Sequence, residues 1–271
     1  MRQKSSNEKL PAASEKRAGP QGSQTLLRGL DMLDQVVDGP IPLPELSARM
    51  GLTRSTTHRL ANALIDRGFL VFFPREGYQL GPKLLQLGFL AQSQVDLIQT
   101  ARPHIESLAM RTEDTVHLGR LDDERALYLD KIPGRRRVEI SSRVGDRQPL
   151  TSTGLGKALM VDTPPNQWRR LFDTDHASGG VPIDYAVWEE RMKSYAAAGR
   201  AFDLEENEDQ IRCVAAPIRD ASNRIVGAIS VSSAAQYMDD QRMDTLSDDV
   251  LATARAISTD LGWQDEKATR K

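Results

Sequence analysis

Cysteine and long apolar runs are both scarce in this sequence of 271 residues. Its one cysteine, Cys213, cannot form an internal disulfide, which is typical of proteins from a reducing compartment. No stretch of about 18 apolar residues is present, and the N-terminus lacks the apolar core of a signal peptide. The sequence therefore predicts a soluble cytoplasmic protein without a membrane span.

Motifs for catalysis and metal binding are also missing. The four histidines lie far apart, and one cysteine cannot form a thiolate cluster. No nucleophile elbow of the form G-x-S-x-G occurs. Gly156 and Lys157 hint at a phosphate loop, but that motif needs glycine where Thr151 stands and serine or threonine where Ala158 stands. We expect no enzymatic activity, catalytic residue, metal or cofactor.

The net charge of −2 is unevenly distributed along a chain long enough for two domains. Residues 1–80 contain 11 Lys and Arg against 8 Asp and Glu, a net charge of +3. Residues 81–271 contain 25 against 30, a net charge of −5. This asymmetry fits a nucleic-acid-binding N-terminal module joined to an acidic domain.

Residues 43–68 have the pattern of two short helices with a tight turn between them. Pro44 suits a helix start, where no backbone donor is needed, and Gly51 suits a left-handed helix end. Thr53 can cap a second helix whose apolar stripe includes Leu60 and Leu64. The pattern is typical of a helix-turn-helix, although paired amphipathic helices also occur in many all-α domains.

The opposite face of the second helix carries hydrogen-bond donors, which could reach phosphates and base edges in a major groove. Two short β-prone runs follow around a turn at 74–77, where Arg75 could contact phosphates. Helix, helix and hairpin together predict a winged helix-turn-helix. The predicted DNA-binding residues are Arg54, Ser55, Thr56, His58, Arg59 and Arg75.

The winged domain is expected over residues 23–80, after a disordered polar tail at 1–22. Its first helix should run from Ser23 to about residue 37. The side chains expected to be buried there are Leu26, Leu27, Leu30, Leu33, Val36 and Val37. A linker helix is expected over 81–101, and its apolar surface predicts self-association. A further helix should begin at Pro103.

From about residue 115 the spacing of apolar residues becomes strand-like. Strands are expected at 116–121, 126–132, 138–140, 201–204, 211–218 and 224–232. Helices are expected at 154–161, 166–172, 184–198 and 239–261. Because these elements mix without alternating as βαβ units, residues 102–264 predict an α+β domain, followed by a tail at 265–271.

Five segments of the sequence together carry a resemblance to a known family. They are RSTTHRLANALIDRGFL, GYQLGPKLLQLG, PLTSTGLGKALM, EENEDQIRCVAAPIRD and IVGAISVSS. In this order and spacing they resemble the signatures of the IclR family of bacterial transcriptional regulators. The resemblance implies a winged helix-turn-helix, a linker helix and a C-terminal GAF-like mixed α/β domain that binds a small effector. It also implies homodimers, or homotetramers built from two dimers, on double-stranded operator DNA.

The resemblance also implies where the effector binds. Family members hold a small carboxylate with backbone amides at the start of the GKA helix, which corresponds to Thr153, Gly154 and Leu155. Free amides and the positive end of a helix dipole suit an anion. Polar side chains are implied at Asp203, Cys213, Ser230 and Ser232. Without the resemblance, the serines also fit a solvent-facing strand, and the cysteine fits a buried small apolar residue.

The run DTVHLGRLDDERALYLDKI is most similar to the sugar-acid subgroup of the family, which includes a regulator that responds to 2-keto-3-deoxygluconate. We therefore expect a repressor of a catabolic operon whose effector is a keto-sugar acid. Related regulators answer to aromatic acids or glyoxylate, and both classes of effector stay open. A function of a different class is a metabolite-sensing module that contacts a protein partner rather than DNA.

Overall fold

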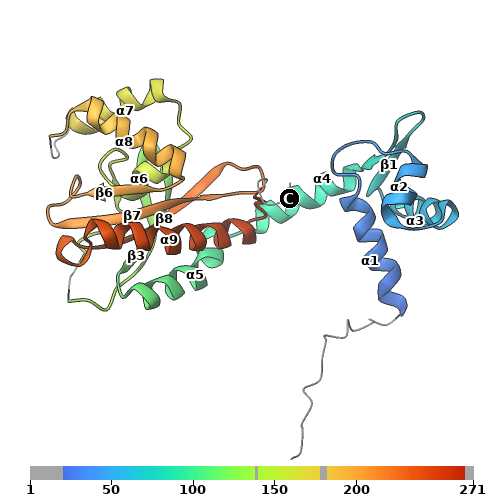
Figure 1. Ribbon diagram of the computed structural model, residues 1–271, viewed down its shortest axis with the longest axis horizontal. Helices are drawn as coiled ribbons and strands as arrows, with labels where there is room; N and C mark the ends of the chain where they lie inside the picture. Colours follow the sequence, from blue (N-terminus) through green and yellow to red (C-terminus); the bar gives the residue numbers. More distant parts are fainter. Residues whose placement is uncertain (1–20, 138–139, 178–181, 266–271) are drawn as a thin grey trace, which may run out of the picture. The chain divides into compact units, whose positions relative to one another are not determined.

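The computed structural model describes residues 21–137, 140–177 and 182–265, which divide into two units (Figure 1). Unit 1 ends at Gln94 and unit 2 begins at Val95. Most of the two predicted tails lies outside the described residues, as does most of the predicted strand at 138–140. Within the described ranges, every helix is too short or too polar to span a bilayer.

Unit 1 has the predicted winged helix-turn-helix. It comprises α1 (Gln21–Asp34), α2 (Leu43–Met50), α3 (Arg54–Asp66), a hairpin of β1 (Leu70–Phe73) and β2 (Gly77–Leu80), and α4 (Pro82–Gln94). An antiparallel bridge between Ile41 and Tyr78 ties the segment before α2 to the hairpin. Glycine is needed at residue 77, because a Cβ there would lie 2.2 Å from the Ile41 carbonyl oxygen. The core consists of Met32, Val36, Ile41, Leu46, Ala61, Leu70 and Tyr78.

The prediction that α1 buries its leucines is wrong for three of the four, and the fourth, Leu33, is half-buried against the core. Leu26, Leu27 and Leu30 are 64%, 54% and 50% exposed. The helix ends at Asp34, so Val36 lies in the following turn, where it is buried, and Val37 is 62% exposed. Only the C-terminal end of α1 reaches the core, and the apolar stripe before it has no cover among the described residues.

The predicted linker helix is divided in two at residues 95–96. α4 ends at Gln94, and α5 spans Leu97–Thr112. Asp96 caps α5, since its Oδ1 accepts hydrogen bonds from the amides of Ile98 at 2.8 Å and Gln99 at 3.2 Å. Pro103, expected to begin a helix, lies inside α5 instead, where packing of the buried face outweighs its missing donor.

Helix α4 buries none of its side chains. Leu85 and Phe89 are 78% and 73% exposed, and Leu90 is 53% exposed. The apolar surface predicted for this segment is therefore present and lies open to solvent.

Unit 2 is built on an antiparallel sheet, which confirms the predicted α+β class. Its strands are β3 (Thr115–Asp122), β4 (Arg125–Ile132), β5 (Arg147–Gln148), β6 (Ala201–Leu204), β7 (Ile211–Arg219) and β8 (Ile225–Ala234). They are ordered β5-β4-β3-β8-β7-β6, and the short β5 was not predicted. The further helices are α6 (Gly154–Leu159), α7 (Pro165–Ala177), α8 (Tyr185–Ala198), the 3-10 turn η1 (Ala235–Tyr237) and α9 (Asp240–Asp260).

Helices cover both faces of this sheet (Figure 1). α5 and α9 pack on one face against residues such as Val214 and Ile229, and α6, α7 and α8 cover the other face near Ala215 and Tyr128. Because side chains alternate along a strand, Cys213 shares the α6 face with Ala215. The predicted polar residues of β6, β7 and β8 therefore point to the α6 side of the sheet.

Candidate functional sites

Helix α3 is fixed on one side and presents polar groups on the other. Thr53 caps it as predicted, because its Oγ1 accepts a hydrogen bond from the Thr56 amide at 3.3 Å. Gly51 ends α2 in the predicted left-handed conformation, with φ of 62°. Thr57 and Ala61 are fully buried. The exposed side chains of α3 include Arg54, Ser55, His58, Arg59 and Asn62.

Thr56 differs from the other predicted DNA-binding residues. It is half-buried, and its hydroxyl accepts a hydrogen bond from the Thr53 hydroxyl at 3.0 Å. Arg75 lies in the exposed turn between β1 and β2, in a left-handed conformation with φ of 77°. The predicted set is therefore split between the first two turns of α3 and the tip of the hairpin.

Three arginines on this surface have no acidic partner among the described residues: Arg54 and Arg59 on α3, and Arg75 on the hairpin. The ion pair found in the described part of unit 1 joins Arg49 to Glu45, both on α2. An exposed guanidinium without a carboxylate partner is free to bind phosphate. This surface therefore has the charge that a nucleic-acid backbone requires.

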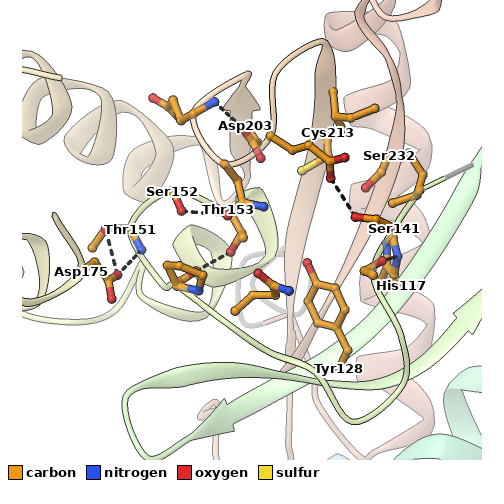
Figure 2. Close-up of a pocket in the computed structure, with 18 of the residues that line it drawn as sticks. His117, Tyr128, Ser141, Thr151, Ser152, Thr153, Asp175, Asp203, Cys213 and Ser232 are labelled. Atoms are coloured by element: carbon orange, nitrogen blue, oxygen red, sulfur yellow. Dashed lines mark hydrogen bonds between the residues drawn. The ribbon is translucent and has the colours of Figure 1, made fainter. Parts of the chain in front are cut away.

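A cavity of about 430 Å³ lies on the α6 side of the sheet in unit 2 (Figure 2). All six strands of the sheet contribute to its wall, together with the loops at 140–142, 149–153 and 206–208 and the end of α7. In Figure 2, Thr151 and Asp175 lie at one end of the labelled side chains, and His117 and Ser141 lie at the other. A cavity of this volume suits a small metabolite.

Four of the predicted effector-binding residues line the cavity. Asp203, Cys213 and Ser232 are register partners across β6, β7 and β8, and Thr153 caps α6 beside them. The other three, Gly154, Leu155 and Ser230, are buried but do not line it. Ser230 shares the face of Ser232 as predicted, yet it is paired with His117 and Ala215, one step further along the strand.

Two backbone amides at the start of α6 already have partners. The Thr153 Oγ1 accepts a hydrogen bond from the Gly156 amide at 3.0 Å, and the Gly154 amide is hydrogen-bonded to the Cys213 sulfur. A Cβ at residue 154 would lie 2.5 Å from the Cys213 Sγ, so glycine is required there. Of the amides predicted to bind an anion, those of Thr153, Gly154 and Leu155, the Gly154 amide is therefore already engaged by the Cys213 sulfur.

A buried charge cluster stands next to the cavity. Lys157 on α6 is 1% exposed, contacts the Glu206 carboxylate through its Nζ, and donates to the Phe202 carbonyl at 3.0 Å. Arg191 on α8 donates to Glu206 at 2.7 Å. Burial lowers the pKa of Lys157. The lysine of the GKA motif does not line the cavity and serves as a counter-ion for Glu206.

Asp203 is the buried acid that faces the cavity without an ion pair of its own in the described structure. It is 4% exposed, and its Oδ1 accepts a hydrogen bond from the Glu206 amide at 2.8 Å. Burial raises the pKa of this carboxyl to about 7, against the opposing effect of Lys157. Burial also raises the pKa of the neighbouring Cys213 thiol to about 12, so that thiol is neutral near pH 7.

Among the described residues, the cavity lining contains four carboxyl side chains, from Asp175, Asp203, Glu206 and Glu208, and no lysine or arginine. Asp175 is neutralised by Arg125 at 2.9 Å and accepts hydrogen bonds from the Thr151 amide and hydroxyl. Glu208 is exposed and accepts from the Ser141 hydroxyl at 3.2 Å. Such a lining suits a ligand rich in hydroxyl donors. No three His, Cys, Asp or Glu side chains of the described chain are grouped to hold a metal ion.

His117 forms a buried part of the wall next to Tyr128, with ring centroids 5.0 Å apart. Its Nε2 lies 2.8 Å from the Ser142 Oγ. Lys131 Nζ donates to the carbonyls of Ile140 at 2.6 Å and Ser142 at 2.7 Å, which fixes this wall segment. Burial, helped by Lys131, lowers the pKa of His117 to about 3, so its imidazole is neutral.

Sequence reasoning missed His117, Asp175 and Glu208 as cavity residues. The sequence did hold a signal for His117. In a strand it points to the face opposite to the apolar Val116 and Leu118, the same face as Thr115. Asp175 lies in a helix rich in charged residues, where no local pattern distinguishes it. Glu208 follows a turn whose path the sequence does not specify.

A winged helix-turn-helix with unpaired arginines, together with a separate unit that holds a polar cavity of metabolite size, defines a ligand-responsive transcriptional regulator. Models of two protein domains agree with this class. Residues 25–72 match the IclR helix-turn-helix domain, and residues 89–259 match the C-terminal domain of the bacterial transcriptional regulator IclR. The chain belongs to the IclR family.

Similar proteins cover nearly the same length. The chain is 31% identical to the transcriptional regulator XynR of Escherichia coli K12 over 246 residues, which is 89% of this chain and 98% of that one. It is 30% identical to KdgR of the same organism, over 83% of this chain and 87% of that one. The crystal structure of the Agobacterium tumefaciens repressor BlcR has the same fold, with a TM-score of 0.77 at 24% identity over 89% of this chain and 98% of that one.

Proposed function

We propose that this regulator represses a catabolic operon, binds its operator through α3 and the β1–β2 hairpin, and responds to a small hydroxylated acid in the cavity of unit 2. The observation that carries the DNA-binding part is a set of exposed arginines, Arg54, Arg59 and Arg75, that have no acidic partner in the described part of the chain. The observation that carries the effector part is a cavity lined by carboxyl and hydroxyl groups.

Arg54 and His58 stand on the first turns of α3, where side chains of a recognition helix meet base edges. Arg75 stands at the hairpin tip, where it would contact the phosphate backbone. Ser55, Thr56 and Arg59 complete the proposed surface. Arg54 and His58 should therefore discriminate between DNA sequences, and Arg75 should not.

Fluorescence anisotropy on the DNA upstream of the protein's own gene, compared with random DNA, tests these roles. Arg54→Ala should cost about 1–3 kcal/mol on the operator and less on random DNA, whereas Arg75→Ala should weaken both and lower the salt slope by about 1. Arg111→Ala in unit 2 is the control and should leave both affinities unchanged. If Arg54→Ala weakens binding to the operator and to random DNA equally, Arg54 positions the protein on the DNA and does not read the base sequence. Failure of the unaltered protein to bind either DNA at low salt would favour a protein partner instead.

A keto-sugar acid is the effector that the lining favours. Among the described lining residues, hydroxyl, amide and carboxyl side chains outnumber the aliphatic side chains of Ile140, Pro149 and Ile211. Glyoxylate would fill a small part of a cavity of about 430 Å³. The acidic and hydroxyl side chains match the several hydroxyl groups of a sugar acid. The resemblance of the chain to KdgR is consistent with this choice.

A thermal shift panel separates the effector classes. A ligand at 100 times its dissociation constant stabilises the folded protein by about 2.7 kcal/mol. We expect such a shift with 2-keto-3-deoxygluconate, and weakened operator binding when the same acid is added to the anisotropy experiment. Stabilisation by aromatic acids or glyoxylate, with none by the sugar acid, would reject this effector.

The proposed functional form is a homodimer or a dimer of dimers, joined in part through the exposed apolar residues of α1 and α4. Sedimentation velocity should show a smaller species when Leu85 and Phe89 are both replaced by aspartate. Met110→Asp is a matched control, because Met110 is 63% exposed on α5. An unchanged mass for the double variant would exclude α4 from the interface.

A further inference from the structure

The balance of charge around the cavity leaves one buried acid uncompensated. Of the four carboxyl groups in the lining, Asp175 is paired with Arg125, and Glu206 is paired with Lys157 and Arg191. Glu208 is exposed and therefore hydrated. Asp203 is therefore the one buried carboxyl group of the described lining that has no ion pair, and it is 4% exposed.

The described surroundings of Asp203 do not supply a free cation. Lys157 is the cation that acts most on the Asp203 carboxyl. Its Nζ, however, contacts the Glu206 carboxylate and donates to the Phe202 carbonyl. Ser232 adds a hydroxyl rather than a charge. The titratable and charged groups that surround Asp203 are Lys157 on α6, Arg191 and Tyr195 on α8, Cys213 on β7, Tyr128 on β4, and Glu205 and Glu206 after β6.

An acidic effector adds a second negative charge to this wall. Two carboxylates that share one poorly solvated site cannot both stay ionised, so one of them takes up a proton. Resting on the proposed acidic effector, we propose that Asp203 binds it as a neutral carboxylic acid that donates a hydrogen bond, so that the effector and a proton are taken up together. The proton comes from solvent and stays on a carboxyl oxygen of Asp203. The only new contact with the effector is the hydrogen bond that this O–H donates.

This role makes Asp203 a determinant of specificity. A neutral donor favours a ligand that presents a carboxylate or another strong acceptor to this wall, and it discriminates against an uncharged sugar of the same size. The affinity for the acid should fall as the pH rises above 7. At higher pH the free Asp203 carboxyl is ionised, and it must first take a proton from a solution that contains fewer of them. Because burial raises the pKa of Asp203 to about 7, the number of protons taken up per ligand should rise from about 0.1 at pH 6 to about 0.9 at pH 8. The dissociation constant should therefore be about tenfold higher at pH 8 than at pH 6.

Calorimetric titration of the full chain with 2-keto-3-deoxygluconate at pH 8, in phosphate and in Tris, measures the protons taken up per ligand. We expect a value close to one. Asp203→Asn keeps the acceptor for the Glu206 amide and offers a permanent donor. It should bind the acid with no proton uptake and with the same affinity at pH 6 and pH 8. Asp203→Ala should bind at least tenfold more weakly at both pH values.

Asp209→Asn is the matched control, since Asp209 lies in the same loop, is exposed and does not line the cavity. It should retain the proton uptake of the unaltered protein. Binding without proton uptake would overturn this inference and leave the effector proposal standing. The inference would also be overturned if the Asp203→Asn variant melts like the unaltered protein yet binds the acid no more tightly than Asp203→Ala. No binding of the acid at either pH would overturn both proposals.

Discussion

The two units treat their charged side chains in opposite ways. On α3 and the hairpin of unit 1, arginines are exposed and lack acidic partners in the described structure. Around the cavity of unit 2, Lys157, Arg191 and Arg125 each contact a buried carboxylate. Charges of unit 1 are thus left available for another molecule, while those of unit 2 hold the shape of the cavity. Substitutions should therefore cost stability in unit 2 and binding, rather than stability, in unit 1.

The largest effect should come from breaking the buried cluster. Lys157→Met leaves Glu206 with one cation fewer in a buried site and should lower the free energy of unfolding of unit 2 by about 3–5 kcal/mol. The three tryptophans, Trp168, Trp188 and Trp263, all lie in unit 2, so tryptophan fluorescence in urea follows that unit alone. Lys157→Met combined with Glu206→Gln should recover part of the loss. A loss below about 1 kcal/mol would mean that the pair contributes no more than a surface pair.

The next effect depends on pH. The pKa of His117 falls from 6.5 in the unfolded chain to about 3 in the folded one, so the unfolded state binds more protons between these values. The stability is present above pH 6.5 and is lost as the pH falls toward 3, by about 2 kcal/mol between pH 7 and pH 5. His117→Gln should reduce the difference in unfolding free energy between those pH values by this amount. His58→Gln in unit 1 should leave the fluorescence-detected difference unchanged, and an equal effect of both variants would contradict the assignment.

A smaller effect should follow from filling the space at residue 154. Gly154→Ala brings a Cβ to 2.5 Å from the Cys213 Sγ and should destabilise unit 2 by about 1–3 kcal/mol. Combining it with Cys213→Ala should restore much of that loss, because the added methyl group occupies the volume of the sulfur. If the losses in unfolding free energy from Gly154→Ala and Cys213→Ala simply add in urea titrations, the methyl group added at residue 154 does not clash with the Cys213 sulfur.

The smallest effect is the one that most sharpens the comparison. Arg59→Ala on the exposed face of α3 should change the stability of unit 1 by less than about 0.5 kcal/mol. Thr53→Ala, at the cap of the same helix, should cost about 1 kcal/mol. Amide hydrogen exchange of residues 54–66 measures both. A larger cost for Arg59→Ala than for Thr53→Ala would show that the unpaired arginine has a structural partner.

Local signals predicted much of the fold, and they failed where tertiary packing decides. Gly51 and Thr53 act through their own backbone neighbours, so the helix-turn-helix could be predicted residue by residue. The leucines of α1 have a helical stripe, but the stripe alone does not say what covers it. Pro103 suggested a helix start, yet the cap at Asp96 and the buried face of α5 set the real boundary.

The cavity was less accessible to prediction. Asp203, Cys213 and Ser232 came from the family resemblance, and strand register places them side by side. Asp175 and Glu208 reach the same cavity from a helix and a loop that the sequence cannot position. The pairing of Lys157 with Glu206 joins residues far apart in the chain, so no local pattern around Lys157 indicated that its side chain would be a buried counter-ion.

The open apolar side chains of α1 and α4 have a consequence for how the protein responds to its own abundance. Nothing in the described part of unit 1 covers Leu26, Leu85 or Phe89. If a second copy covers them, the covered form grows with the square of the free protein concentration, while the uncovered form grows only in proportion to it. Halving the amount of protein in a cell then quarters the paired form at low occupancy. Expression level becomes an input to regulation in its own right, alongside the metabolite.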